Sequence, residues 1–458
     1  MLTYDMSERG GLPLYEYLCR RIRADILSGV LAAGEQLPSR RALAQHLGVS
    51  MVTVDTAYGQ LVDEGYLRAA PRRGYFVAQV QAVPETPHPP VTLPQPETPV
   101  WMDLVSNHTP EALFPFSIWA RLTRTVISER GAQLLSPVPY HGVPELRQAI
   151  AAHLRRFRGL DADPACIVVG AGAEYLYPMV VQFLGRDRRY GVENPGYGKI
   201  ARIYAQNGAD IVYLGMDREG VRMDALEQSG AQVVHLSPSH HFPTGIVTTM
   251  ARRQALLRWA QAAPDRYILE DDYDSEFRFT GKPLRPLQSL DGAGRTLYLN
   301  TFSKTISPAF RISYLVLPRA LAAEYGARMA FYASPVPALD QYVLAQFLDG
   351  GYFERHIGRM KRAYRVRRDA VIAAIKASGL RGEIQEAGAG LHFLLRLDTA
   401  VPDATLRQAA LENGIRISFL SEYYHGGGMA EEHLVLFNYT GVDLARLPQA
   451  LEQLAALQ

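Results

Sequence analysis

The segment NTFSKTISPAFR (300–311) combines residue types that together suit the chemistry of an amine. Lys304 directly follows Ser303 and lies three residues after Thr301, and Arg311 comes seven residues later. A lysine amine can form a Schiff base with an aldehyde, while hydroxyl groups and a guanidinium can bind a phosphate. The chain has only five lysines among its 48 basic residues, so the setting of each lysine can be judged individually.

A second group of reactive side chains lies upstream, in RYILEDDYDSEFRF (266–279). The run from Tyr267 to Leu269 is strand-like and is followed by the acids Glu270, Asp271 and Asp272. In α/β domains the carboxyl ends of the strands face the ligand crevice. A carboxylate there can hold the pyridinium nitrogen of pyridoxal 5'-phosphate (PLP) and make its ring an electron sink. A single lysine or acid cluster is usually solvated, so it is the combination that favours a PLP site.

The first 80 residues predict a small domain of short helices and a hairpin. Apolar residues recur at helical spacing within 13–29. Ser39 is a suitable N-cap for a second short helix, Gly48 ends it, and Ser50 can cap a third helix, MVTVDTAYGQLVDEGY (51–66). Two short helices joined by a glycine-containing turn are typical of a helix-turn-helix. After Gly65, YLRAAPRRGYFVAQ alternates as a two-stranded hairpin does.

This pattern predicts that the small domain binds DNA. The second helix of a helix-turn-helix enters the major groove, and arginines neutralise phosphates or enter the minor groove. Residues 39–75 contain five arginines against three acids. The alternative is a helical cap with a solvated arginine turn. The residues expected at the DNA are Ser39, Arg40, Arg41, Ser50, Thr53, Asp55, Thr56, Tyr58, Arg72, Arg73 and Gly74.

The stretch QAVPETPHPPVTLPQPETPV (81–100) divides the chain, because seven of its twenty residues are proline. Proline fixes φ and removes backbone donors, which excludes a regular helix or a central strand. We expect a semi-rigid spacer between a domain at 1–80 and a larger one at 101–458. The alternative is a long surface loop inside a single domain.

The composition excludes several other classes of protein. The net charge of +2 excludes a polycation or an acidic tail protein, and 48% hydrophobic residues are ordinary for a globular chain. Two cysteines, Cys19 and Cys166, exclude a disulfide scaffold or a four-thiolate zinc site, and we expect no metal. No apolar run is long enough to span a membrane. The polar N-terminus is not a secretory signal, so we expect a soluble cytoplasmic protein.

The small domain resembles the winged helix-turn-helix domain of the GntR regulator family. The resemblance runs over about 65 residues, from PLY at 13 through LPSRRALAQHLGVS (37–50) to the wing RRGYFV (72–77). That family commonly has an arginine directly after the VS dipeptide, where this chain has Met51. The resemblance thus implies DNA binding in which this one position contributes no cation.

The larger domain resembles the fold-type I PLP enzymes, the aspartate aminotransferase-like group, over roughly 101–458. Its motifs follow in the family order: SPVPYHGVPELRQAIAAHLRRFRG (136–159), IVVGAGAEYLYPMV (167–180), VENPGYGK (192–199), SPSHHFPTG (237–245) and EDDYDSEF (270–277). The resemblance implies an α/β domain whose smaller C-terminal subdomain covers roughly 335–458. It also implies that PLP is bound to Lys304 as a Schiff base.

The same resemblance implies a role for each residue of the PLP site. The phosphate would be held by Gly172, Ala173, Glu174, Ser303 and Arg311, with the backbone amides of the first three at a helix N-terminus. Tyr197 would stack on the ring, and His241 would lie near the ring oxygen. Tyr273 would hold the phenolic oxygen. Asp271 would hold the ring nitrogen, since the family register counts from Phe277 and only one of Asp271 and Asp272 can face the ring.

The order of winged helix, proline-rich linker and aminotransferase-like domain resembles the bacterial transcription regulators of MocR/GabR type. In that family PLP is bound and an amine, an amino acid or PLP itself is sensed. The resemblance implies a head-to-tail homodimer that binds double-stranded promoter DNA. An active aminotransferase with an accessory DNA-binding domain is the alternative. A regulator whose pocket never binds PLP is disfavoured, since Lys304 and its partners are all present.

Two departures from the family pattern affect which effector the protein can bind. Aminotransferases usually hold the substrate carboxylate with an arginine on a late strand, where HLVLFNYTGV (433–442) has Leu436. Arg416 is a possible substitute. GabR-like members use an arginine two residues after the stacking tyrosine, where this chain has Lys199, a point charge without bidentate geometry. We therefore predict Lys199 and Arg416 as effector-binding residues and do not expect γ-aminobutyrate.

Overall fold

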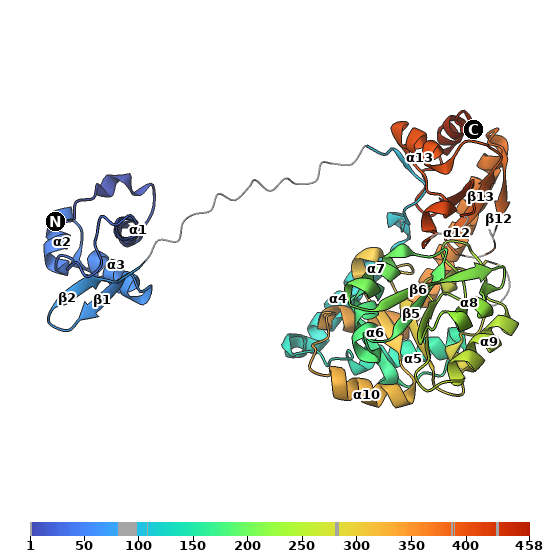
Figure 1. Cartoon of the computed structure of the whole chain (residues 1–458), viewed down its shortest axis with the longest axis horizontal. Helices are drawn as coiled ribbons and strands as arrows, with labels where there is room; N and C mark the ends of the chain where they lie inside the picture. The colour runs from blue at the N-terminus through green and yellow to red at the C-terminus, as the bar shows by residue number, and fades with distance from the viewer. Residues whose placement is uncertain are drawn as a thin grey trace. The chain divides into compact units, whose positions relative to one another are not determined.

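The computed structural model describes residues 2–80, 99–107, 109–279, 284–385, 388, 390–426 and 430–458. The chain divides into two compact units, Met1–Gln95 and Pro96–Gln458. Figure 1 labels many of the elements of each unit. Most of the proline-rich stretch predicted as a linker, 81–98, lies outside the described residues.

The N-terminal unit is a helix-turn-helix followed by a two-stranded wing. Its elements are η1 (Met6–Arg9), α1 (Leu14–Leu27), α2 (Arg40–Leu47), α3 (Met51–Asp63), β1 (Leu67–Ala70) and β2 (Gly74–Val77). Ser39 and Ser50 cap α2 and α3 as predicted, because each side chain accepts a hydrogen bond from a backbone amide three residues on. Gly48 ends α2 with a positive φ of 65°. The wing strands are antiparallel, with Leu67 opposite Val77.

Tyr58 on α3 was predicted to contact DNA, and the structure shows this to be wrong. Its side chain is fully buried among the apolar residues that join the three helices and the wing. The Tyr58 hydroxyl donates to the carbonyl of Pro38 at 3.0 Å, and its ring meets Tyr75 edge-on at 4.9 Å. The inward face of α3 includes Val54, Tyr58 and Leu61, whose spacing is that of one side of a helix.

The C-terminal unit is built on an eight-stranded sheet. The central strands run parallel, whereas the strand at 313–316 pairs antiparallel with both its neighbours and the edge strand at 220–221 pairs antiparallel with the strand at 210–217. The strands at 167–170, 233–236 and 296–301 are buried along their whole length, as expected where both faces of a sheet are covered. The order across the sheet is β4 (Ile167–Gly170), β11 (Ser313–Val316), β10 (Thr296–Thr301), β9 (Tyr267–Asp271), β8 (Val233–Leu236), β5 (Arg189–Asn194), β6 (Asp210–Asp217) and β7 (Gly220–Val221).

Helices cover both faces of this sheet. Val169 and Tyr298 pack with one set of helices, while their chain neighbours Val168 and Leu297 pack with another, because strand side chains alternate between faces. The first set is α4 (Phe116–Arg130), α5 (Pro144–Arg158) and α11 (Ala338–Asp349). The second set is α6 (Ala173–Leu184), α7 (Gly198–Gln206) and α10 (Arg319–Met329). A further core holds α8 (Met223–Gln228) and α9 (Met250–Gln261).

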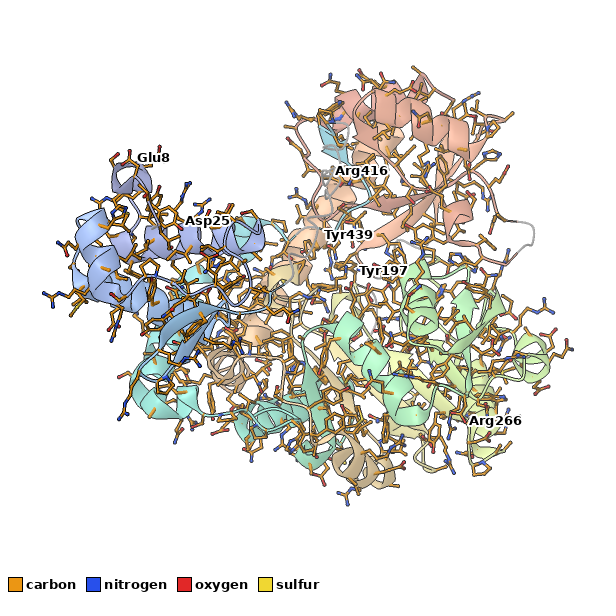
Figure 2. All side chains as sticks on the ribbon, turned by 60° about the vertical axis from the view of Figure 1, so that its left-hand side comes forward. Glu8, Asp25, Tyr197, Arg266, Arg416 and Tyr439 are labelled. Atoms are coloured by element: carbon orange, nitrogen blue, oxygen red, sulfur yellow. The ribbon has the colours of Figure 1, made fainter. Side chains whose placement is uncertain are left out.

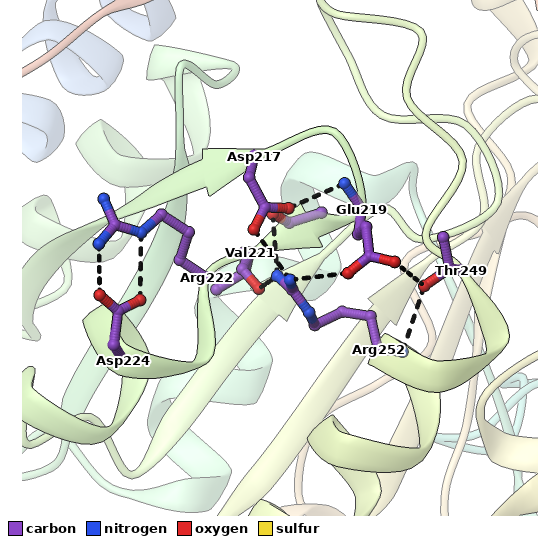
Figure 3. A network of polar contacts seen from close by, with 8 residues as sticks. Asp217, Glu219, Val221, Arg222, Asp224, Thr249 and Arg252 are labelled. Atoms are coloured by element: carbon purple, nitrogen blue, oxygen red, sulfur yellow. Dashed lines mark hydrogen bonds and ion pairs between the residues drawn. The ribbon is translucent and has the colours of Figure 1, made fainter.

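A polar network fixes the outer edge of the sheet to α9 (Figure 3). Arg252 on α9 donates to Asp217 at 2.8 Å and to Glu219 at 3.2 Å, and it also bonds the carbonyl of Val221. Thr249 caps α9 and donates to Glu219 at 3.3 Å. These contacts hold the β6–β7 hairpin in place, and none of these residues lines the large cavity described below.

The C-terminal elements form a separate core. Antiparallel strands β12 (Gly382–Gln385), β13 (His392–Leu397) and β15 (Leu434–Asn438) pack with the helices α12 (Tyr352–Ala377), α13 (Asp403–Glu412) and α14 (Leu447–Ala455). A short strand near the start of the unit, β3 (Met102–Asp103), pairs with β14 (Ile415–Arg416) and joins this core. The predicted start near residue 335 falls before α11, whose side chains pack in the larger core instead. No helix within the described parts of the chain is long and apolar enough to cross a membrane.

Candidate functional site

A cavity of about 390 Å³ opens at the carboxyl ends of the central strands. Glu193 from β5, Asp271 from β9 and Thr301 from β10 contribute to its wall. Leu391, next to β13, and Asn438 on β15 line it from the C-terminal core. The cavity therefore lies where α/β sheets bind ligands and is bounded by both subdomains.

Asp271 is the last residue of β9 and is held on one side only. Its Oδ2 accepts a hydrogen bond from the Tyr177 hydroxyl at 2.7 Å and lies 3.2 Å from His235 Nε2. The Nδ1 of His235 is 2.7 Å from the Tyr204 hydroxyl. If that hydroxyl donates to Nδ1, the ring proton lies on Nε2, and Nε2–H then donates to Asp271. The other oxygen, Oδ1, is buried and has no hydrogen-bond partner among the described residues. That orphaned acceptor in the cavity wall suits a protonated ring nitrogen.

Asp272 faces the opposite way. Its Oδ2 lies 2.7 Å from the Arg158 guanidinium and accepts from the Tyr298 hydroxyl at 2.6 Å. Both charged side chains are almost completely buried. The alternation of strand side chains thus sends Asp271 to the cavity and Asp272 to a structural ion pair on the other side of β9.

Lys304 lies in the turn after β10, and its side chain lines the cavity. Burial lowers the pKa of its amine, against the raising effect of the nearby Asp274 and Asp271 carboxylates. A lowered pKa increases the neutral fraction, which is the nucleophilic form. Tyr273 also lines the cavity, and burial raises the pKa of its phenol, so the hydroxyl stays protonated. Its oxygen lies 3.2 Å from His240 Nδ1.

One end of the cavity has the features of an anion cradle. Gly172 precedes α6 with a φ of 90°, and a Cβ placed there would lie 2.6 Å from the Arg311 guanidinium. Only glycine permits that approach. The first residues of α6, Ala173 and Glu174, line the cavity together with Ser303 and Arg311. A helix N-terminus, a hydroxyl and a guanidinium are suitable partners for a phosphate.

Tyr197, predicted to stack on a cofactor ring, lines the cavity with its ring edge-on to Phe242 at 5.7 Å. Tyr197 is labelled in Figure 2. The side chain is partly exposed because the cavity is open at this point.

His241, predicted near the ring oxygen, does not line the cavity. Its Nδ1 lies 2.7 Å from the Thr244 hydroxyl and its Nε2 lies 3.4 Å from a carboxylate oxygen of Glu193. Burial lowers the pKa of His241 to about 3, so the ring is neutral and the contact with Glu193 is not an ion pair. The cavity wall at this point is formed by Glu193, Ser237 and Phe242. The path of the chain after β8 buries His241 behind that wall, so its predicted place near the ring oxygen is wrong.

Glu193 lines the cavity and was not predicted as a site residue, although it lies in the VENPGYGK segment. Its carboxylate accepts from the Ser237 amide at 2.9 Å. Burial raises the pKa of Glu193 to about 8, with a smaller contribution from Asp271. Tyr177, His235 and Asp274 were missed for a similar reason, since single tyrosines, histidines and acids carry no motif of their own.

The two predicted effector residues lie away from the cavity wall. The Lys199 ammonium donates to Glu174 at 2.5 Å, on the outside of the anion cradle. Arg416 lies in the C-terminal core region (Figure 2), where it lines a separate surface hollow and approaches Asp103 at 3.5 Å. Its place is fixed by the pairing of β14 with β3. Leu436 is buried in an apolar cluster with Leu394.

Apart from Lys304 and Arg311, the described residues of the cavity wall include no lysine or arginine. Polar and aromatic groups of the wall include Asn107, Tyr213, His392, His425 and Asn438. The Nε2 of His425 is buried without a hydrogen-bond partner among the described residues.

The predicted DNA-contacting residues gather on the N-terminal unit. Arg41, Thr56, Arg72, Arg73 and Gly74 are exposed, with the last three at the tip of the wing. The remaining residues also have roles within the fold. Ser39 and Ser50 cap helices, and the Thr53 hydroxyl lies 2.8 Å from that of Ser50. Arg40 bonds Asp55.

Comparison with known proteins identifies both units. The family of bacterial regulatory proteins, gntR family, matches residues 14–77, and the family of aminotransferases of class I and II matches residues 100–435. The chain is 31% identical to the probable rhizopine catabolism regulatory protein MocR of Rhizobium meliloti, over 99% of this chain and 95% of that one. The chain belongs to the MocR/GabR-type transcription regulators.

Other relatives that this MocR/GabR-type regulator matches over almost its whole length are named as HTH-type transcriptional regulators. It is 32% identical to the HTH-type pyridoxine biosynthesis transcriptional regulator PdxR of Corynebacterium glutamicum, over 96% of this chain and 94% of the relative. It is also 32% identical to the uncharacterized HTH-type transcriptional regulator YdeL of Bacillus subtilis, over 97% and 96%.

Solved structures confirm the fold of the larger unit. A kynurenine aminotransferase of Pyrococcus horikoshii superposes with a TM-score of 0.67 at 22% identity, covering 79% of this chain and 90% of that one. An archaeal alanine:glyoxylate aminotransferase gives 0.67 at 23% identity, covering 78% and 90%. The fold is therefore aminotransferase fold type I, joined to a winged helix-turn-helix. Aminotransferases of class I and II depend on PLP.

Proposed function

We propose that this regulator binds PLP covalently through Lys304 and senses an amine, an amino acid or PLP itself in the same cavity. The observation that carries the proposal is the position of the Lys304 amine and the orphaned Asp271 carboxylate oxygen in one cavity wall. When bound, PLP supplies an aldehyde that condenses with amines and a ring that withdraws electrons.

Each group of the site has a specific task in this proposal. Asp271 Oδ1 would accept a hydrogen bond from the protonated ring nitrogen, while Tyr177 and His235 keep the carboxylate oriented through Oδ2. Tyr273 offers its hydroxyl to the phenolic oxygen. Ser303, Arg311 and the amides at the start of α6 hold the phosphate. Tyr197 covers a face of the ring.

Sensing requires a ligand that binds two conformations of the protein with different affinities. The cavity is suited to this, because Asp271 and Lys304 come from the sheet while His392 and Asn438 come from the C-terminal core. A ligand that contacts both sides changes the free energy of their relative position. We infer that this position governs how the winged helices engage DNA.

We further propose that two copies form a head-to-tail dimer in the cytoplasm and place two winged helices on two half-sites of promoter DNA. Large apolar side chains at the start of α4 and beyond the end of α10, Phe116 and Phe331, are exposed in the single chain. An interface between copies would bury them.

The proposal is tested with purified full-length protein. We expect an absorbance band near that of a PLP Schiff base when PLP is added, no such band with Lys304→Ala, and promoter footprints that change when an effector is bound. Unchanged effector-dependent transcription with Lys304→Ala would overturn covalent sensing.

An active aminotransferase is the second candidate, because the Lys304 and Asp271 arrangement is intact. Sustained turnover of amino and keto acid pairs would support it. The buried, apolar setting of Leu436 and the absence of a second arginine among the described cavity residues weigh against it.

A further inference from the structure

The outward face of α3 carries two bulky apolar side chains at its first turn. Met51 is 59% exposed and Val52 is 72% exposed, directly after the Ser50 cap. The opposite face, with Val54 and Leu61, is fully buried. Within residues 2–80 no side chain covers this exposed pair. Two adjacent large apolar side chains exposed to water are typical of a surface that binds a partner.

DNA is the occupant that the surroundings favour. The N-terminal residues of the second helix of a helix-turn-helix contact base edges in the major groove. The same unit exposes Arg41, Arg72 and Arg73, which are suited to phosphates. Guanine is read mainly by arginine or lysine, and neither Met51 nor Val52 can do this. The one apolar group that bases present in the major groove is the 5-methyl group of thymine.

Asp55 extends this surface by one helical turn. It is exposed on the same helix, and its carboxylate is bonded by Arg40. The Arg40 guanidinium also lies 5.9 Å from the centre of the Tyr75 ring, which helps to hold the pair in place. A carboxylate is repelled by phosphates, but it can accept a hydrogen bond from the 4-amino group of cytosine.

We propose that α3 reads pyrimidine edges, with Met51 and Val52 against thymine methyl groups and Asp55 against a cytosine amino group. The inference rests on the proposed binding of double-stranded DNA and adds the base chemistry that the helix recognises. It follows that operator half-sites contain thymine beside cytosine where α3 enters the groove.

The test begins with full-length protein and a pool of random-sequence duplexes, from which bound duplexes are selected and sequenced. Each thymine of a selected duplex is then replaced by deoxyuridine, which removes only the methyl group. We expect a loss of about fourfold in affinity for each methyl contacted, since burying one such carbon contributes about 0.8 kcal/mol. The Met51→Ala, Val52→Ala double variant should lose this sensitivity.

Val30→Ala is the matched control, because Val30 is 71% exposed in the same unit but lies outside α2 and α3. This variant should retain the full penalty for deoxyuridine. Asp55→Asn gives a second, independent readout. Asparagine pairs with adenine rather than cytosine, so the selected base at one position should change from cytosine to adenine.

The outcomes separate this inference from the proposed function. If no duplex is enriched, DNA binding itself fails and the inference fails with it. If duplexes are enriched but deoxyuridine and thymine bind wild-type protein equally well, DNA binding stands and methyl readout is wrong. An unchanged base preference in Asp55→Asn would show that Asp55 does not contact cytosine. Equal DNA binding by the double variant would leave the apolar pair as a surface for another protein.

Discussion

Tyr177 donates a hydrogen bond of 2.7 Å to Asp271, linking the inner face of α6 to the end of β9. The acceptor is Oδ2, so the bond leaves Oδ1 directed away from Tyr177 and without a partner among the described residues. Tyr177 thereby orients the carboxylate through Oδ2 and leaves Oδ1 available for a ligand. Since this relationship joins two elements far apart in the chain, it depends on the fold of the whole sheet.

Tyr177→Phe should weaken PLP binding by about tenfold, because a hydrogen bond to a charged group contributes about 1.5 kcal/mol or more. The dissociation constant is measured by titration of the PLP absorbance band. Tyr190→Phe is the matched control: it removes a buried hydroxyl that bonds the carbonyl of Gly185 at 2.9 Å, away from the cavity. Equal losses in both variants would show a general effect of destabilisation.

The Lys199–Glu174 pair should govern phosphate affinity rather than contact an effector. The Lys199 ammonium donates to Glu174 at 2.5 Å, and this bond raises the pKa of the lysine. With Lys199→Met, the Glu174 carboxylate keeps the Arg311 guanidinium at 3.7 Å as a partner and competes with the phosphate for it, so we expect a few-fold loss of PLP affinity. Adding Glu174→Gln should restore affinity. A double variant as weak as Lys199→Met alone would contradict the electrostatic explanation.

Condensation of PLP with Lys304 should occur at a lower pH than expected for an ordinary lysine. Burial lowers the pKa of the amine below its usual 10.5, so the neutral nucleophile is populated at lower pH. The rate of formation of the absorbance band should rise with pH and level off before pH 10.5 is reached. The reference is the same reaction with a free lysine side-chain amine. Coincident pH profiles for the two amines would exclude a depressed pKa.

Glu193 should make the protein less stable as the pH rises. Burial raises its pKa from 4.5 to about 8 in the folded state. Between those values the folded state holds a proton that the unfolded state has released, so stability is lost with rising pH until the folded pKa is passed. The slope is at most about 1.4 kcal/mol per pH unit.

Thermal melting of wild type, Glu193→Gln and Glu227→Gln at pH 6, 7 and 8 measures this contribution. Glu193→Gln should flatten the pH dependence, whereas Glu227→Gln, an exposed carboxylate on α8, should follow wild type. Parallel curves for all three proteins would show that Glu193 carries no such proton.

Replacing only one partner of the buried Arg158–Asp272 pair should strongly destabilise the protein. Removing one partner of such a pair leaves an uncompensated charge and costs about 3–5 kcal/mol. Arg158→Met should therefore lower the free energy of unfolding by that amount. Arg158→Met combined with Asp272→Asn should recover most of it. Urea unfolding of the three proteins measures the difference, and additive losses would argue against coupling.

Local sequence determined the elements whose signals lie within a few residues. Ser39 and Ser50 cap α2 and α3 because a cap requires only a side chain and a backbone amide three residues away. The wing follows from alternation around a glycine-containing turn. The motifs around Lys304 and Asp271 likewise predicted the fold of the larger unit, which the comparisons with known proteins confirm.

Tertiary structure decided which side chains meet. Tyr58 is polar at one end, and only packing against Tyr75 showed that it faces inward. His241 and Arg416 have suitable chemistry, but the path after β8 and the β14–β3 pairing direct them away from the cavity. The sequence by itself thus determined the two folds and singled out Lys304, which lies in the cavity wall. Tyr177, His235 and Asp271 come from α6, β8 and β9, and only the folded sheet with its covering helix brings these distant residues within hydrogen-bonding distance.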